Sequence, residues 1–399
     1  MDLKKIFIYT TAIILSTNLS INSNNIFNTS IFNMNIAKAA EEDLNQLLNQ
    51  IKERVAKDSR INLFDIKAER KNDQIILSGR VIDPNLKKEI LEAFKTYSNI
   101  KDEIQIFPFS EIGDLSYGVV NLPVMQIRDN PRHSAQLITQ ALFGMGLKVI
   151  GKSQEKPDWI QVSMDDDKYI GWAKKADIWF INKKEYDNWF SSDKIIITEP
   201  IINLLNTPNE NDKSGIKLFL STRLNNIDKN SNFYKVKLTG GNKYYSNHYF
   251  YIPKNSARFI GKNLLPLNIK GEDLWKKGQT MFSTPYLWGG ASPNMTDCSG
   301  FTQMLYKTHG YMLPRDADQQ QEFTKPIKTI SELKSGDLVF FAENKGKKAT
   351  HVGLYMGDKK FIHSSVGYGG VAITSFDSKD PLFNDWYIEN FIGGGRILK

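Results

Sequence analysis

The first stretch with a regular pattern of apolar and polar positions, residues 40–112, predicts two helices around a pair of strands. Apolar and polar residues alternate on both sides of Asp73, as in a strand–turn–strand pair, and "NLKKEILEAFKTY" has the spacing of an amphipathic helix. An earlier helix carries apolar side chains that share one face: Leu44, Leu47, Leu48, Ile51 and Val55. The pattern predicts a small α+β module.

From residue 116 the pattern changes to short apolar runs separated by turn residues, which predicts two small β-barrels in tandem. We expect the first barrel over 116–182 and the second over 192–262. The segments "MQIRDNPRH", "GLKVIGKS" and "DWIQVSMDD" align with "INLLNTPNE", "TRLNNIDK" and "NFYKVKLTG", which lie about 75 residues further along the chain. The repeat predicts one fold used twice.

The last segment, residues 268–399, mixes helix and strand patterns and contains the only cysteine of the chain. A loop rich in glycine and proline precedes a helix that we expect to begin near Cys298. Two strand-like runs follow in "THVGLYMGDKKFIHSS", and they place His351 and His363 on neighbouring strands joined by a tight turn. Strand pairing can therefore bring both imidazole rings to one side of a sheet.

The N-terminal segment indicates an exported protein. Two lysines precede an apolar run of roughly a dozen residues, and Ala37-Lys38-Ala39 then offers small residues at the positions of a signal-peptidase site. We expect residues 1–39 to be a signal peptide, the mature protein to be secreted or cell-wall associated, and no stable membrane span to remain after cleavage; an uncleaved anchor is the alternative. The net charge of +8 suits any polyanion, but no dense basic run stands out, so nucleic acid is not an expected partner.

A lone cysteine is either a small apolar residue or a reactive thiol, and its neighbours decide between the two. At a helix N-terminus, free N–H groups and the helix dipole favour the thiolate and can face a developing oxyanion. His351 can act as the base toward Cys298, and His363 can hold that imidazole in the useful tautomer. A buried structural cysteine and a zinc site formed by these three side chains remain alternatives, although the zinc site lacks a fourth ligand.

Four motifs in order, "DCSGF", "SGDLVFF", "THVGLYMG" and "FIHSS", resemble the NlpC/P60 peptidases, papain-like cysteine enzymes that cut peptides of bacterial peptidoglycan. The resemblance implies an α+β fold class, with a papain-like catalytic domain over 268–399. It also implies that Cys298 is the nucleophile, His351 the base and His363 the orienting residue. The two barrels resemble bacterial SH3-like domains, and "IILSGRV" in residues 40–112 resembles a BON-type module.

The surroundings of the thiol are similar to the γ-D-glutamyl-L-diamino acid endopeptidases within this family, on the motifs "PYLWGG", "DCSG" and "LPRDADQQ". There a carboxylate at Asp297 would bind the ammonium of the substrate's N-terminal L-Ala. Gln136 stands where relatives usually have glutamate, so a strict requirement for the free amine is in doubt. The implied substrate-binding residues are Tyr286, Trp288, Asp297, Ser299 and Asp316, with Gln136 and Tyr169 contributed by the first barrel.

Together these patterns predict an exported cysteine endopeptidase that hydrolyses the bond between γ-D-Glu and a diamino acid, diaminopimelate or lysine, in peptidoglycan stem peptides with a free N-terminal L-Ala. The expected partners are stem peptides or muropeptides and the cell wall, and neither a cofactor nor a metal is expected. A non-catalytic wall-binding protein and an N-acetylmuramoyl-L-alanine amidase are the alternatives. An amidase would release whole stem peptides that begin with L-Ala.

Overall fold

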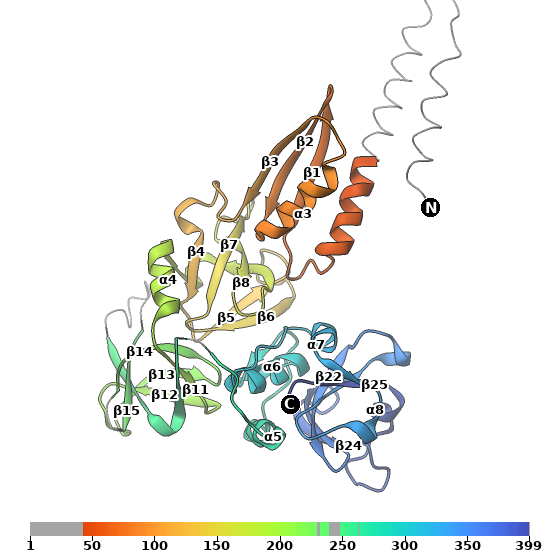
Figure 1. Cartoon of the computed structure of the whole chain (residues 1–399). Helices are drawn as coiled ribbons and strands as arrows, with labels where there is room; N and C mark the ends of the chain where they lie inside the picture. Colours follow the sequence, from red (N-terminus) through yellow and green to blue (C-terminus); the bar gives the residue numbers. More distant parts are fainter. Residues whose placement is uncertain (1–42, 230–231, 239–247, 263, 399) are drawn as a thin grey trace, which may run out of the picture. The chain divides into compact units, whose positions relative to one another are not determined.

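The computed structural model describes residues 43–229, 232–238, 248–262 and 264–398 (Figure 1). The signal peptide predicted over residues 1–39 lies outside the described residues. The described chain forms two compact units, one made of the residues up to 57 with 64–105, and one made of 58–63 with the chain from 106 onward. None of the helices in the described ranges has both the length and the apolar composition that a membrane span needs.

The first unit is a three-stranded sheet of order β1-β2-β3 with two helices. Its second helix, α3, begins where the side chain of Asp83 accepts the N–H of Asn85, and Pro84 takes the first helical position. Strand β3 was not predicted, because its sequence "IKDEIQI" is mostly polar. The bounds are 43–55 for the first helix, then β1 Phe64–Lys71, β2 Gln74–Val81, α3 Pro84–Phe94 and β3 Ile100–Ile106.

In the second unit, the two strand-rich segments each form a seven-stranded sheet, and the two sheets share one strand order. The first runs β10-β4-β7-β8-β9-β5-β6 and the second β17-β11-β14-β15-β16-β12-β13, so each strand has its counterpart seven labels later. Strands β5, β7 and β8 fall in the three predicted repeat segments, and β12, β14 and β15 fall in their counterparts. The internal repeat predicted from the sequence is therefore confirmed.

The bounds of the first sheet's strands are β4 Tyr117–Val120, β5 Val124–Arg128, β6 Leu137–Leu142, β7 Gly146–Lys152, β8 Trp159–Met164, β9 Ile170–Lys174 and β10 Ile178–Ile181. Helix α4, Lys183–Ser191, then leads to the second sheet. Its strands are β11 Lys194–Ile197, β12 Ile201–Leu205, β13 Lys213–Phe219, β14 Arg223–Lys229, β15 Phe233–Lys237, β16 Tyr249–Pro253 and β17 Ala257–Gly261.

The C-terminal part of the second unit is built on a six-stranded antiparallel sheet of order β20-β25-β21-β22-β23-β24, coloured blue in Figure 1. Strand β21 shows how alternation gives the sheet two buried faces: Leu338 and Phe340 pack with helices α5 and α6, whereas Val339 and Phe341 pack with Tyr387 of α8. The helices are α5 Gly271–Gln279, α6 Cys298–Thr308, α7 Ala317–Phe323 and α8 Asp385–Glu389. The strands are β18 Ala291–Ser292, β19 Met295–Thr296, β20 Lys325–Ile327, β21 Leu338–Phe341, β22 His351–Gly357, β23 Lys360–Ser365, β24 Gly370–Ser375 and β25 Phe391–Arg396.

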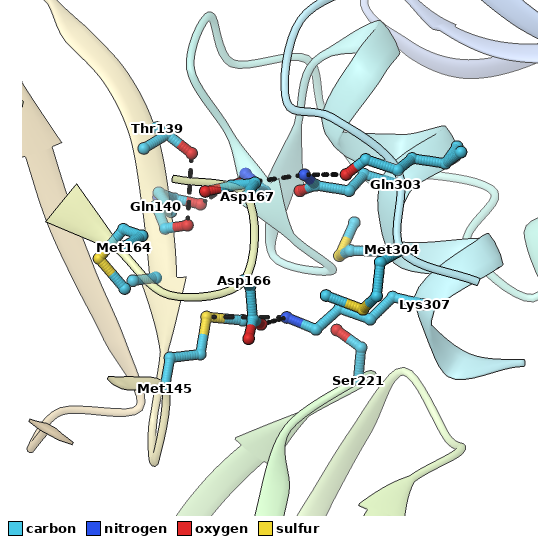
Figure 2. Close-up of a pocket in the computed structure, with 14 residues that line it drawn as sticks. Thr139, Gln140, Met145, Met164, Asp166, Asp167, Ser221, Gln303, Met304 and Lys307 are labelled. Carbon is cyan, nitrogen blue, oxygen red and sulfur yellow. Dashed lines mark hydrogen bonds and ion pairs between the residues drawn. The ribbon is translucent and has the colours of Figure 1, made fainter. Parts of the chain in front are cut away.

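Helix α6 is linked to both seven-stranded sheets by buried charges, and Figure 2 shows the contact between Lys307 and Asp166. Lys307, near the end of α6, pairs with Asp166 in the loop after β8, and Asp166 also pairs with Arg223 of β14. Although burial raises the pKa of Asp166, Arg223 and Lys307 hold it below its usual range. On the same helix, Gln303 Nε2 donates to Asp167 Oδ2 over 3.1 Å. The first sheet is thereby held beside the helix that carries the thiol.

Candidate active site

The predicted nucleophile, Cys298, is the first residue of helix α6 and is buried, with 7% of its surface exposed. The helix starts there because the Asp297 side chain accepts the N–H of Gly300 over 2.7 Å. Only glycine fits at position 300, since a Cβ atom there would lie 2.2 Å from the carbonyl oxygen of Gly290. The sulfur lies against the backbone N–H of Val352, which follows His351 at the start of β22.

The two predicted histidines contact each other directly, as strand pairing led us to expect. His351 Nε2 lies 2.7 Å from His363 Nδ1, and His363 Nε2 lies 3.0 Å from Thr374 Oγ1 on β24. If His363 donates to Thr374, its Nδ1 accepts the Nε2–H of His351, and the Nδ1 of His351 keeps a free lone pair. This assignment leaves His351 able to take a proton from a thiol.

Burial disfavours the thiolate of Cys298 when His351 is neutral, and it disfavours the imidazolium of His351 when Cys298 is a thiol. It raises the pKa of Cys298 to about 12, with Asp297 adding to the rise and the N–H groups of Val352 and Ser299 opposing it. Burial lowers the pKa of His351 to about 4 and also holds the pKa of His363 well below its usual value. Our expectation that the helix N-terminus favours a lone thiolate is therefore opposed by burial. Transfer of the thiol proton to His351 instead creates two opposite charges together and keeps the pair neutral overall.

The lowered histidine pKa values predict that acid destabilises the fold. Below the unfolded value of 6.5, an unfolded chain binds a proton that His351 does not bind in the folded state until the pH nears 4. His351 alone should therefore lower the free energy of unfolding by about 2 kcal/mol between pH 7 and pH 5, and should contribute nothing above that window. Urea unfolding at the two pH values measures the loss, which should shrink in His351→Asn. An equal loss in the variant would contradict the prediction.

Two neighbouring cavities border Cys298 and His351. One, of about 390 Å³, contains Cys298, and the other, of about 590 Å³, contains His351. Both are bordered by Tyr286, Trp288 and Thr350. The first brings together eight of the ten predicted site residues: Gln136, Tyr169, Tyr286, Trp288, Asp297, Cys298, Ser299 and Asp316. The thiol and imidazole thus have room on both sides for an extended peptide.

Asp297 lines the first cavity, but its carboxylate has partners within the protein. Oδ1 accepts from Arg315 Nη1 at 3.0 Å as well as from the N–H of Gly300, and Oδ2 accepts from Arg315 Nη2 at 2.6 Å and from the N–H of Gly289 at 2.9 Å. Ser299 Oγ donates to Oδ1 over 3.3 Å. These bonds hold the start of α6 and the preceding loop in place, and the binding of a substrate ammonium by Asp297 stays a prediction.

Asp316 presents a different environment, because its carboxylate points to the first barrel and to a distant segment. Tyr169 donates its hydroxyl to Asp316 Oδ2 over 2.7 Å, so this side chain contributes a polar group to the cavity. Arg60 Nη1 donates to the same oxygen over 2.8 Å. Two arginines of the site were not predicted from the sequence. Arg60 lies 256 positions before Asp316 and belongs to no motif. Arg315 directly precedes Asp316 inside "LPRDADQQ".

The zinc alternative receives no support from this geometry. The ring nitrogens of His351 and His363 that face each other share a hydrogen bond. In the described part of the chain, no group of three or more His, Cys, Asp or Glu side chains is placed to hold a metal ion.

Comparison with known proteins agrees with this geometry. The NlpC/P60 family matches residues 283–389, and the bacterial dipeptidyl-peptidase Sh3 domain matches residues 127–178. A gamma-D-glutamyl-L-lysine dipeptidyl-peptidase of Bacillus cereus is 31% identical over 272 residues, which cover 66% of this chain and 76% of that protein. The protein of the same name from Bacillus subtilis is also 31% identical, over 57% of this chain and 71% of its own length.

A solved structure gives the same result. The crystal structure of an NlpC/P60 family protein from Bacillus cereus matches with a TM-score of 0.60 and 25% sequence identity, and covers 71% of this chain and 100% of that one. The matched families account for both the domain that carries the thiol and the first seven-stranded sheet, in a mixed α+β chain. With a cysteine at a helix start, two linked histidines and these relatives, the chain belongs to the NlpC/P60 family of cysteine peptidases.

Proposed function

We propose that this protein hydrolyses the bond between γ-D-Glu and the diamino acid of peptidoglycan stem peptides. Cys298 gives its proton to His351, and the sulfur attacks the γ-carbonyl carbon. The protonated His351 then donates to the leaving amine, which frees the diamino acid and leaves a thioester. Water, deprotonated by His351, attacks the thioester and returns the thiol, while His363 orients His351 throughout.

The observation that carries this proposal is the position of the Cys298–His351–His363 series between two cavities. The cavity of Cys298 is suited to the acyl part of the peptide, and the cavity of His351 to the leaving diamino acid. The names of the Bacillus relatives, which specify gamma-D-glutamyl-L-lysine, support the choice of bond.

The negative oxygen of the tetrahedral intermediate has two donors available in this proposal. The backbone N–H of Cys298 is free of an intrahelical partner because it is the first residue of α6. Tyr286 borders the same cavity, and burial together with the nearby sulfur raises the pKa of its hydroxyl, so that it stays protonated and can donate. We assign the remaining substrate contacts to Trp288, Ser299 and Asp316, with Tyr169 and Gln136 completing the wall.

We also propose that the protein acts outside the cytoplasm, secreted or associated with the cell wall, on the strength of the apolar leader and the Ala37-Lys38-Ala39 site. The wall-binding alternative is disfavoured by the complete set of Cys298, His351 and His363, since binding requires none of them.

The test is product analysis by mass. The mature chain from residue 40 is incubated with L-Ala-γ-D-Glu-L-Lys, with the diaminopimelate form, and with the muramyl forms of both. We expect the free diamino acid as a product from at least one tripeptide. Release of intact peptides beginning with L-Ala from a muramyl form would instead show an amidase, and no product from any substrate would favour the wall-binding alternative.

A further inference from the structure

The cavity of about 590 Å³ that contains His351 has one acidic side chain on its wall and no basic one. Among the described residues that border it, Glu343 is the only carboxylate, and none is a lysine or an arginine. Burial lowers the pKa of His351 to about 4, so its imidazole is uncharged near pH 7. Much of the remaining wall is aromatic: Tyr286, Trp288, Tyr368, Trp386 and Tyr387. The cavity therefore combines aromatic rings with a net negative charge.

Paired strands set the position of Glu343 relative to His351. Phe341, the last residue of β21, pairs with His351, the first residue of β22, and Glu343 lies two residues beyond Phe341. The turn that contains Glu343 is tied to α8, because the N–H of Asn344 donates to Oδ1 of Asn390 over 3.1 Å. Helix α8 carries two of the aromatic rings in the wall. Glu343 is thus held beside the same cavity as the imidazole of His351.

The carboxylate of Glu343 is available to a ligand. The residue is exposed, and within the described part of the chain its side chain takes part in no hydrogen bond or ion pair. Neutral polar groups of the same wall do have partners. Asn384 Nδ2 donates to the Tyr368 hydroxyl over 3.4 Å, and the hydroxyls of Ser365 and Tyr387 lie 3.2 Å apart. Of these groups, the carboxylate is the one that attracts a cation most strongly.

An aromatic wall with one carboxylate suits an alkylammonium group. In the proposed function this cavity receives the leaving diamino acid. Lysine has a flexible aliphatic side chain that ends in a single ammonium, so the rings can pack against the chain and Glu343 can pair with the charge. Diaminopimelate has a carboxylate beside the amine at the same end of its side chain. That carboxylate would lie near Glu343 with no cation among the residues that border the cavity.

Resting on the proposed function, we propose that Glu343 binds the side-chain ammonium of the leaving diamino acid and thereby selects lysine over diaminopimelate. The main-chain carboxyl group is common to both diamino acids and contributes no preference. Diaminopimelate that is amidated at its side-chain carboxyl lacks the repelled charge and is accepted like lysine.

The test compares kcat/KM of the full mature chain for four tripeptides that begin with L-Ala-γ-D-Glu. Their third residue is L-lysine, L-norleucine, diaminopimelate or diaminopimelate amidated at the side-chain carboxyl. Norleucine keeps the aliphatic chain and lacks the ammonium. We expect the lysine peptide to exceed the norleucine and diaminopimelate peptides by about fivefold, a size limited by the exposure of the carboxylate. The amidated peptide should be close to the lysine peptide.

Substitutions at Glu343 test whether its charge causes the preference. Glu343→Gln should lower the lysine-to-norleucine ratio to about one, because the ammonium loses its partner. Glu343→Lys should reverse the order of lysine and diaminopimelate, since a cation at this position attracts the extra carboxylate and repels the ammonium. Glu343→Asp, which keeps the charge, should keep the order. Glu389→Gln, the same change at an exposed acid of α8 that does not border the cavity, should leave every ratio unchanged.

The outcomes separate this inference from the function on which it rests. Cleavage of the γ-D-Glu bond at equal rates for lysine and norleucine, or unchanged ratios in Glu343→Gln and Glu343→Lys, overturns the role of Glu343 while the bond specificity stands. Better cleavage of the diaminopimelate peptide than of the lysine peptide by the unmodified protein also overturns it. Products from another bond, or none, overturn the proposed function and this inference with it. Thermal unfolding of each variant identifies a loss of fold, and Glu343→Lys supplies the ratio where Glu343→Gln does not fold.

Discussion

Replacing Cys298 by alanine is expected to abolish cleavage of the γ-D-Glu–diamino acid bond, with a loss in kcat/KM on the order of 10⁴-fold or more. The reason is that no neighbouring group can take over the attack. The hydroxyl of Ser299, the adjacent side chain, donates to Asp297 Oδ1 and accepts from Arg315 Nη1 at 2.9 Å. Release of the diamino acid, followed by mass, measures the loss.

Alkylation supplies an independent control, because Cys298 is the only thiol in the chain. Iodoacetamide should inactivate the unmodified protein with one equivalent incorporated, and should not label the alanine variant. The rate at which iodoacetamide alkylates Cys298 should also drop in His351→Asn. Burial keeps the thiol protonated, and the imidazole is needed to receive its proton. Substantial cleavage by a folded Cys298→Ala protein would rule out the thioester route.

The placement of Cys298, His351 and His363 was predictable because these residues occupy regular elements with strong local patterns. Cys298 begins a helix marked by a capping aspartate and a glycine, and His351 and His363 lie on strands joined by a short turn. The strand-rich part was equally accessible, since alternation and repetition reveal both sheets. These features depend on neighbours in the sequence, where residue periodicity carries the information.

The charges that surround the series were not predictable, because they arise between distant segments. The sequence indicates a free carboxylate at Asp297 beside Cys298, whereas in the structure Arg315 donates to both of its oxygens. Arg60 reaches the cavity from a short segment that has no motif of its own. Strand β3 was missed for a different reason. Its mostly polar sequence lacks a strand pattern, and the strand forms because its backbone groups pair with those of β2.

Replacing Arg315 by methionine should lower the free energy of unfolding of the second unit by roughly 3–5 kcal/mol. Arg315 is 1% exposed, and its change to an uncharged side chain leaves the carboxylate of Asp297 buried without its cation. It also removes the bond from Arg315 Nε to Thr139 Oγ1 of β6, 2.8 Å long, which joins the first sheet to the segment before α7. Urea unfolding followed by the fluorescence of the chain's tryptophans measures the change.

A matched control is Lys183→Met, which also removes one positive charge but from an exposed pair with Asp187. Its cost should be much smaller than that of Arg315→Met, because water already solvates both charges. A similar small cost for Arg315→Met would contradict the prediction.

A double-mutant cycle then separates the ion pair from the packing of the side chains. Asp297→Asn keeps a side chain that can cap α6 but removes its charge, so alone it leaves the guanidinium of Arg315 buried and unpaired. Each single variant therefore leaves one unmatched charge, whereas the double variant leaves none. The cost of the double variant should fall below the sum of the single costs by about 2 kcal/mol or more. Additive costs would mean that the two side chains stabilise the fold separately, and that the position of Cys298 does not depend on their pairing.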